Sequence, residues 1–258
     1  DGSIVLAEGA AGSVANWVAL MNDAARRLGM AESHFGTPNG WMDNGNTHVS
    51  ARDLVKLATA MVTRYPAYYR RYVGRPGMAW NGIAQRNHDP MIGVVAGADG
   101  IKTGFTDEAH YNFLGSAERG GRRLIMVIAG VPKHQDRAKA SRALMEWGFA
   151  AFDTKPLVAA GSQVGEAQVQ GGAMTTVPLI APRAYFATLA KGTKAQVAMR
   201  IIYHGPLQAP IAKGSEVAQL ELRMPGEPPA RLPLVAAVDV ETGNMFDRLR
   251  AGLRRLVS

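Results

Sequence analysis

The stretch Asp99-Gly100-Ile101-Lys102-Thr103-Gly104-Phe105-Thr106 is the part of the sequence that best indicates the fold. Two runs rich in apolar residues follow it, at 111–116 and 124–129, with Gly120-Gly121 between them. Short runs of this composition, bounded by glycine turns, are typical of β-strands joined by a tight turn. The region therefore predicts an antiparallel hairpin entered from the strand that carries Lys102.

The side chains of that first strand suggest a chemistry. Gly104 has no side chain, so a peptide substrate could lie close alongside the strand edge. Lys102 would add positive potential to a cleft there, and Thr103 would hydrogen-bond a substrate carboxylate. The alternative is a strand entered through a glycine turn with an exposed lysine, because Lys-Thr-Gly alone is common by chance.

Two helices are expected near the start of the chain. Residues 4–8 and 17–28 place apolar side chains three and four positions apart, and Gly12 and Gly29 stand where these helices would end. Residues 35–40, Phe-Gly-Thr-Pro-Asn-Gly, have the composition of a turn.

Two further helices are predicted around the hairpin. Ser50 is placed to cap a helix that passes through Met61 and ends before Pro66. A second helix is predicted from about residue 137 to residue 152. Its expected buried face consists of Ala143, Leu144, Trp147 and Phe152.

The composition changes after residue 153 to short strands broken by glycine and proline, which predicts a separate all-β domain over 154–240. Residues 1–153 would form the first domain. Residues 241–258 predict an amphipathic helix, whose arginines suit an anionic membrane surface and whose apolar face could instead pack on a domain. The apolar face comprises Met245, Phe246, Leu249, Leu253, Leu256 and Val257, and the basic face comprises Arg248, Arg250, Arg254 and Arg255.

Composition narrows the classes of partner and cofactor. The net charge of +8 suggests an anionic partner, and the alternative is a solvated surface that is simply basic. The absence of cysteine excludes disulfides and thiolate metal sites. The six histidines show no His-x-x-x-His spacing, so no metal site is expected. Nucleic-acid binding is not expected, because no single element was identified that clusters basic and aromatic residues. No run approaches the roughly 18 apolar residues of a membrane-spanning helix.

The wider context of Lys102-Thr103-Gly104 resembles the third motif of the serine DD-peptidases and β-lactamases. Other stretches resemble the low-molecular-mass penicillin-binding proteins, a family of D-alanyl-D-alanine carboxypeptidases, and together they extend over nearly the whole chain. These stretches are Val5-Leu6-Ala7-Glu8 with Ala11-Gly12-Ser13, the segment 21–30, His34-Phe35-Gly36-Thr37-Pro38-Asn39-Gly40, Ser50-Ala51-Arg52-Asp53-Leu54, Trp147-Gly148-Phe149 and Ala209-Pro210-Ile211-Ala212-Lys213-Gly214.

The resemblance implies specific site residues. Lys102 would be catalytic, and substrate would be bound by Lys102, Thr103, Gly104, Thr106 and Arg137. Arg137 matches a family arginine that helps to bind the terminal carboxylate of the substrate, which suits the planar fork of a guanidinium. The alternative is a solvent-exposed arginine at the start of a helix. The family's Ser-x-x-Lys and Ser-x-Asn motifs do not occur in these 258 residues. We therefore expect the nucleophile segment to be missing from this chain by truncation, and the chain alone to be inactive.

The resemblance also implies an α/β (α+β) fold, in which an incomplete DD-peptidase/β-lactamase-like domain precedes the β domain. The implied function is removal of the terminal D-alanine from peptidoglycan stem peptides through an acyl-enzyme, without cofactor or metal. β-Lactams would acylate the same serine, and the enzyme would lie in the bacterial periplasm, with the C-terminal helix on the inner membrane. Alternatives are a related endopeptidase, a β-lactamase, which the β domain disfavours, or a non-catalytic envelope scaffold.

Overall fold

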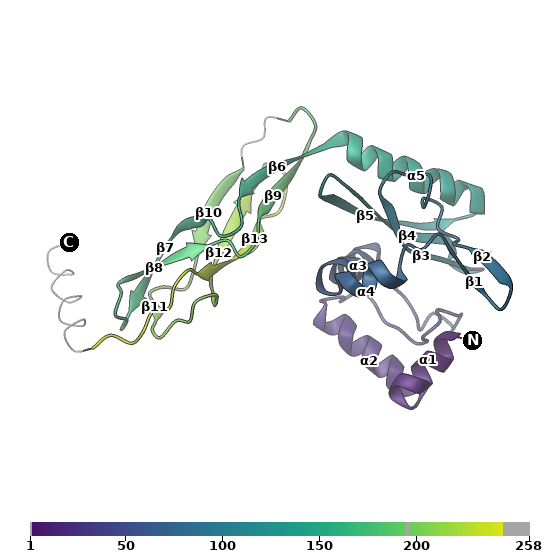
Figure 1. Cartoon of the computed structure of the whole chain (residues 1–258), viewed down its shortest axis with the longest axis horizontal. Helices are drawn as coiled ribbons and strands as arrows, with labels where there is room; N and C mark the ends of the chain where they lie inside the picture. Colours follow the sequence, from purple (N-terminus) through teal and green to yellow (C-terminus); the bar gives the residue numbers. More distant parts are fainter. Residues whose placement is uncertain (1, 194–196, 245–258) are drawn as a thin grey trace. The chain divides into compact units, whose positions relative to one another are not determined.

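The structure is a computed structural model that describes residues 2–193 and 197–244. The chain divides into two compact units, one up to Ala150 and one from Ala151 onward. The first unit contains both helices and strands, whereas the described part of the second unit is built from strands (Figure 1). The fold is thus mixed α and β, followed by a β-rich unit, as the sequence predicts.

The first unit is organised around a three-stranded antiparallel sheet in the order β3-β4-β5. Helix α5 lies on one face of this sheet, and α3 lies on the other (Figure 1). The elements of this unit are α1 (Gly2–Ala11), α2 (Val14–Arg27), α3 (Ala51–Arg64), α4 (Pro66–Tyr72), β1 (Gly77–Trp80), β2 (Ile83–Arg86), β3 (Ala98–Thr106), β4 (His110–Arg119), β5 (Arg122–Val131) and α5 (His134–Ala151).

The central strand β4 explains why the sheet is covered on both faces. Its residues 113–117 are all buried, whereas a strand with one wet face would alternate between buried and exposed positions. Phe113 packs in one core cluster with Met91, with Met126 of β5 and with Met145 of α5. Burial of these large side chains attaches α5 to the sheet.

A polar cluster fixes the beginning of β3. Arg123 of β5 forms an ion pair with Asp99 at 2.7 Å, and it also donates to Ser116. The Tyr69 hydroxyl donates to the Asp99 carbonyl at 3.1 Å, and burial raises the pKa of Tyr69 to about 12. The tyrosine therefore stays protonated and keeps donating at physiological pH. These contacts hold the start of β3 against the neighbouring strands and α4.

The predicted early helices and the hairpin are confirmed. Gly12 and Gly29 follow α1 and α2 with positive φ angles of 76° and 71°, conformations that glycine adopts without strain. Ser50 caps α3 by accepting a hydrogen bond from the Asp53 amide at 3.2 Å. Strands β4 and β5 are joined at Gly120-Gly121, as expected.

The predicted buried face of the fourth helix is wrong at three of its four residues, and only Leu144 is half-buried and packs against the core cluster. Helix α5 begins at His134, and its buried residues are Arg137, Ser141 and Met145, while Trp147 is 56% exposed. Ala143 is also exposed and Phe152 belongs to a strand. The pattern of apolar residues predicted a helix face next to the one that is buried, because an arginine and a serine were not expected to face the sheet.

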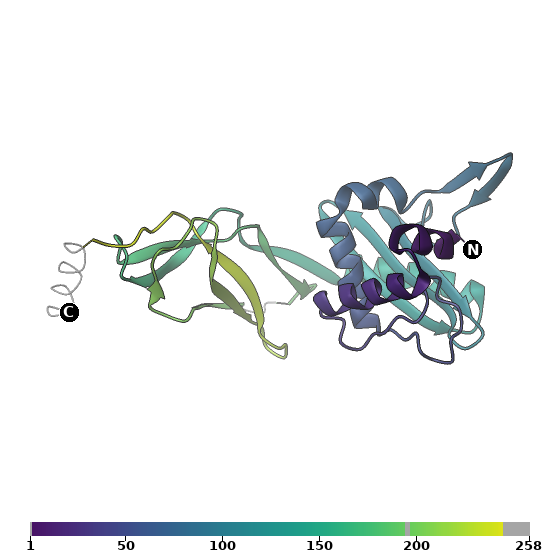
Figure 2. The same ribbon diagram turned by 90° about the horizontal axis from the view of Figure 1, so that it is seen from below.

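Two elements near the middle of the chain were not foreseen. Pro66 starts the short helix α4, a position that proline favours because its missing N–H would have no intrahelical partner there. Strands β1 and β2 form a hairpin about Asn81-Gly82, which extends away from the rest of the first unit (Figure 2).

The second unit contains a six-stranded sheet in the order β10-β12-β13-β8-β7-β11 and a separate β6-β9 pair. In β8 and β9, buried residues alternate with more exposed ones, which places one face of these two strands in the core. Val177, Leu179, Leu220 and Leu234 are at most 1% exposed and form the centre of that core. The strands are β6 (Phe152–Val158), β7 (Gln163–Gln170), β8 (Thr176–Ile180), β9 (Tyr185–Ala190), β10 (Ala198–Ile202), β11 (Leu207–Gln208), β12 (Glu216–Arg223) and β13 (Ala230–Ala236).

The predicted C-terminal helix does not begin at Glu241. Thr242 forms an antiparallel bridge with Gly172, and the Gly243 amide donates to the Gly171 carbonyl at 2.8 Å. These backbone bonds keep residues 241–244 extended beside the β unit. The remainder of the predicted helix, 245–258, lies outside the described residues.

Among the described ranges, no helix is by itself long and apolar enough to cross a bilayer. Helices α1 and α2 would meet these criteria only as a pair, and the chain bends by 86° between them.

Candidate functional site

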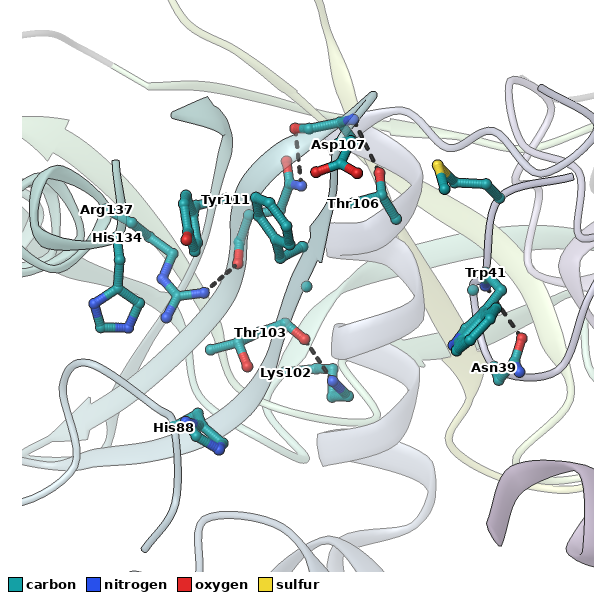
Figure 3. Close-up of a pocket in the computed structure, with 16 residues that line it drawn as sticks. Asn39, Trp41, His88, Lys102, Thr103, Thr106, Asp107, Tyr111, His134 and Arg137 are labelled. Atoms are coloured by element: carbon teal, nitrogen blue, oxygen red, sulfur yellow. Dashed lines mark hydrogen bonds between the residues drawn. The ribbon is translucent and has the colours of Figure 1, made fainter. Parts of the chain in front are cut away.

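A pocket of about 810 Å³ lies along β3. Strand β3 is at the edge of its sheet, so its outer side pairs with no other strand among residues 2–193 and 197–244. Figure 3 shows Lys102 and Thr103 of this strand within the site, together with Arg137 and His134 from α5 and Trp41 from a loop. The pocket is lined by Asn39, Gly40, Trp41, Met42, His88, Lys102, Thr103, Gly104, Phe105, Thr106, Asp107, Ala109, Tyr111, Asn112, His134 and Arg137.

All five residues singled out in the sequence line this one pocket. Lys102 and Gly104 are exposed, and Thr103 is half-buried and pairs with Phe113 of β4. The Thr106 hydroxyl accepts a hydrogen bond from the Ala109 amide at 2.9 Å, which closes the turn after β3. The Lys102 ammonium donates only to the neighbouring Thr103 carbonyl among the contacts that the structure describes, so it remains accessible from the pocket.

The glycine at position 104 is not required by the fold. A Cβ atom added there would find only the Asn112 Cβ, at 4.0 Å, within contact distance. By contrast, a Cβ on Gly97, just before the same strand, would lie 2.1 Å from the Glu118 carbonyl oxygen. Gly97 is therefore explained by packing inside the protein, whereas space above Gly104 remains open on the pocket side.

Arg137 is a buried cation at the wall of the pocket. Arg137 is 3% exposed, and one of its Nη atoms donates to the Asn112 carbonyl at a long distance of 3.4 Å. The guanidinium carbon lies 5.5 Å from the centre of the Tyr111 ring. Burial lowers the pKa of Arg137, but an arginine stays charged at physiological pH.

The Nε of Arg137 is buried and donates to no acceptor among the described residues. A buried cation with a donor lacking an acceptor is costly, and an anion bound in the pocket would relieve that penalty. The arrangement therefore suits a ligand with a carboxylate at one end and an extended backbone along β3.

Several lining residues were not recognised from the sequence. Tyr111 contacts Phe105 with ring centroids 4.4 Å apart, and His134 meets Tyr111 edge-on at 5.6 Å. Tyr111 stands next to the motif stretch and His134 precedes Arg137 by three residues, so their proximity to the motif was the available signal. Trp41 lies far from Lys102 in sequence, but it directly follows the stretch 34–40 that carries part of the family resemblance, and that adjacency was its only signal.

A second pocket, of about 1060 Å³, lies beside α3 and the sheet and also reaches Lys102. Its wall is largely apolar. The apolar residues include Leu54, Leu57, Met61, Ile101, Leu114, Val127 and Ile128.

The loop that brings Trp41 to the site is attached to α3 by a buried carboxylate. Asp53 is 0% exposed and accepts hydrogen bonds from the Glu32 amide at 2.8 Å and the Ser33 hydroxyl at 2.9 Å. Lys56 pairs with the other oxygen of Asp53 at 2.7 Å. The hydrogen bond from Lys56, helped by those from Glu32 and Ser33, lowers the pKa of Asp53 below its usual value against the opposing effect of burial.

The described residues contain no group of three or more His, Cys, Asp or Glu side chains that could hold a metal ion.

Comparison with protein families gives two matches that divide the chain as the structure does. Residues 1–133 match the family model described as D-alanyl-D-alanine carboxypeptidase. Residues 152–242 match the model of the penicillin-binding protein 5 C-terminal domain. The class is thus a DD-peptidase unit followed by the β-rich domain of this group of penicillin-binding proteins. The chain belongs to the D-alanyl-D-alanine carboxypeptidase family.

Individual relatives agree. The chain is 32% identical over 252 residues to the D-alanyl-D-alanine carboxypeptidase DacA of Haemophilus influenzae, covering 96% of this chain and 64% of that protein. It is 30% identical to DacA of Escherichia coli, covering 96% of this chain and 62% of the relative. The crystal structure of penicillin-binding protein 5 from Haemophilus influenzae matches with a TM-score of 0.76 and 33% identity, covering 92% of this chain and 70% of that one. The chain thus spans slightly less than two thirds of the length of these curated relatives.

The pKa of Asp53 predicts a pH-dependent stability. Because the folded-state pKa is lowered, the carboxylate stabilises the fold above its unfolded pKa, and this contribution is lost as pH falls through the folded value, below 3.8. Asp53→Asn should therefore lower the thermal midpoint at pH 7, and the difference from wild type should shrink as pH falls below 3.8.

Thermal unfolding followed by circular dichroism at several pH values measures this effect. Asp153→Asn, at an exposed position of β6, is the matched control and should change the midpoint little at any of them. A deficit of Asp53→Asn that is the same at pH 3 and pH 7 would show that the charge is not what matters.

Proposed function

We propose that the whole protein is a serine-type D-alanyl-D-alanine carboxypeptidase of the bacterial periplasm, which removes the terminal D-alanine from peptidoglycan stem peptides. The observation that carries this proposal is the buried Arg137, whose Nε has no acceptor among the described residues, in the same pocket as an open strand edge. A free carboxylate at the end of an extended peptide is the ligand that such a site suits best.

The substrate would lie along the outer edge of β3. The absence of a side chain at Gly104 lets its backbone approach closely, and the carboxylate would meet Arg137 and the Thr103 hydroxyl. Thr106 would contact the substrate from the end of the strand. Lys102 would supply positive potential and take part in proton transfer. The backbone N–H just after Gly104 would help to stabilise the oxyanion.

The serine nucleophile would come from residues outside this 258-residue sequence, which contains neither Ser-x-x-Lys nor Ser-x-Asn. We propose that the segment bearing it packs into the apolar pocket beside α3, because that pocket also opens on Lys102. The serine oxygen would attack the carbonyl between the last two D-alanines and form an acyl-enzyme ester. The C–N bond would break, and the serine proton would pass to the amine of the D-alanine that leaves. Water would then hydrolyse the ester and restore the serine.

β-Lactams would acylate the same serine, since they present a carboxylate and a strained amide to the same groups. Neither a metal nor a cofactor takes part in the proposed reaction. We also propose peripheral attachment to the inner membrane through the basic and apolar residues of 241–258, a segment that lies mostly outside the described residues.

The 258 residues alone should form no covalent adduct with a fluorescent penicillin and should release no D-alanine from a D-Ala-D-Ala peptide. The reason is that they lack the Ser-x-x-Lys motif, which supplies the nucleophilic serine and its lysine base. Gel fluorescence and a D-alanine assay measure this. The whole protein is the positive control, and covalent labelling of the 258-residue chain would disprove the expectation.

In the whole protein, Lys102→Ala should slow acylation by penicillin about 100-fold or more, because both charge and contact are lost. Gly104→Ala should slow it at least tenfold by obstructing the strand edge. Neither change should shift the thermal midpoint much, because both positions are exposed. Stopped-flow acylation and thermal unfolding separate the two effects, and normal acylation by Gly104→Ala would argue against binding at this edge.

Arg137→Ala should reduce kcat/KM for a D-Ala-D-Ala peptide by about 10- to 100-fold, and by more than it reduces acylation by a β-lactam. Arg137→Lys should recover only part of this loss, because an ammonium keeps the charge but not the planar fork. Lys139→Ala, which removes an exposed cation from the same helix, is the matched control. If Arg137→Ala reduced peptide turnover and β-lactam acylation equally, Arg137 would not be the group that binds the peptide carboxylate.

A further inference from the structure

The β1–β2 hairpin displays an apolar face that the first unit leaves exposed. Trp80 pairs with Ile83 across the strands, and Met78 pairs with Gln85 two positions along, so these side chains share one face of the ribbon. Met78 is 63% exposed, Trp80 77% and Ile83 63%. An isolated two-stranded ribbon gains little stability in water, and three large apolar side chains on one face suit a second surface that covers them.

The segment leading into the hairpin is strongly basic. From Arg64 to His88 inclusive, the sequence contains five arginines and neither aspartate nor glutamate. Arg70, Arg71, Arg75 and Arg86 are all exposed, and the structure describes no ion pair for any of them. Within the described residues this local charge is not neutralised by an ion pair, and it favours an anionic partner.

Aromatic side chains accompany these arginines on α4, a grouping that was not recognised from the sequence. Tyr65, Tyr68 and Tyr72, at and within α4, are 58%, 65% and 64% exposed. Helix α4 leads directly into the hairpin, and the hairpin extends beyond the sheet of this unit in both views (Figures 1 and 2). Tyrosine and tryptophan combine an apolar ring with a polar group, so they prefer the boundary between lipid headgroups and hydrocarbon.

We propose that α4 and the β1–β2 hairpin form a docking surface for an anionic lipid bilayer, with the hairpin tip entering the headgroup region and the arginines contacting lipid phosphates. We call this set the hairpin surface. It comprises Tyr65, Tyr68, Arg70, Arg71, Tyr72, Arg75, Met78, Trp80, Ile83 and Arg86.

The chemistry of the hairpin surface distinguishes lipid from other partners. A second copy of this chain would bring the same arginines together, and like charges at close range oppose such a contact. A polysaccharide or nucleic acid could use the arginines and rings, but the aliphatic Met78 and Ile83 at the projecting end need an apolar environment. A bilayer offers both phosphates and hydrocarbon. This inference does not depend on the proposed catalytic activity or on residues 245–258.

The test uses the whole protein with its chain ended at Asn244, so that the basic C-terminal segment does not contribute. Binding to vesicles of phosphatidylglycerol and phosphatidylcholine should be detectable by co-sedimentation at low salt and at least tenfold weaker to phosphatidylcholine alone. Trp80→Asp with Ile83→Asp should weaken binding at least tenfold. The control is Phe186→Asp, which charges a 55% exposed aromatic residue of β9 and should leave binding unchanged.

Two double variants test the role of the arginines. Arg70→Ala with Arg71→Ala should reduce the partition coefficient about 20- to 30-fold, at roughly fivefold for each charge near an anionic surface. Arg26→Ala with Arg27→Ala should have little effect, because both of these arginines already pair with Asp23. If both double variants lost vesicle binding equally, net charge alone would explain the loss, and the proposed surface would be overturned.

Insertion can be observed directly. Brominated lipids should quench part of the tryptophan fluorescence of the protein, and Trp80→Phe should remove that quenching while leaving vesicle binding nearly intact. Each variant must retain its thermal midpoint and its penicillin labelling, which separates a failure of this surface from a failure of the enzyme. Absence of binding to anionic vesicles, or tip-dependent binding to peptidoglycan sacculi or nucleic acid instead, would overturn the lipid assignment.

Discussion

The candidate site depends on the pairing of β3 with β4 along one edge only. The ion pair of Arg123 with Asp99, supported by Tyr69, fixes where β3 begins, and the β4 register then determines the position of every residue along it. The outer edge of β3 has no strand beside it within the described residues. A strand edge exposes backbone donors and acceptors, so it can bind an extended peptide without further rearrangement. The side chains proposed for catalysis and the backbone proposed for substrate binding are thereby held on one strand.

The burial of Arg137 is the second constraint, and it opposes stability. Helix α5 turns this guanidinium toward the sheet beside Tyr111, where its Nε lacks an acceptor among the described residues. The apolar cluster of Met91, Phe113 and Met145 keeps the helix in this position despite the penalty. A site that holds an incompletely satisfied cation gains binding energy when a carboxylate arrives, because the desolvation has already taken place.

Much of the local structure was predictable, because it depends on neighbours in sequence. The Ser50 cap, the glycines after α1 and α2, and the Gly120-Gly121 turn all act within a few residues. The buried face of α5 was not predictable from apolar periodicity, because its central residues are polar. The hairpin at 77–86 was missed although Asn81-Gly82 is a typical hairpin turn, because the four-residue strands on either side show no alternation of apolar and polar side chains.

By itself, the sequence determined the family, the change from a mixed unit to a β-rich one, and the presence of Lys-Thr-Gly on a strand, since all three follow from residue order. Only the tertiary structure decided that Gly97 packs against backbone whereas Gly104 opens on a pocket. It also decided that Arg137 is buried beside that pocket. It also decided that the hairpin's apolar face remains uncovered within the first unit. The physical reason is that burial and open space arise from contacts between segments distant in sequence, which local patterns do not encode.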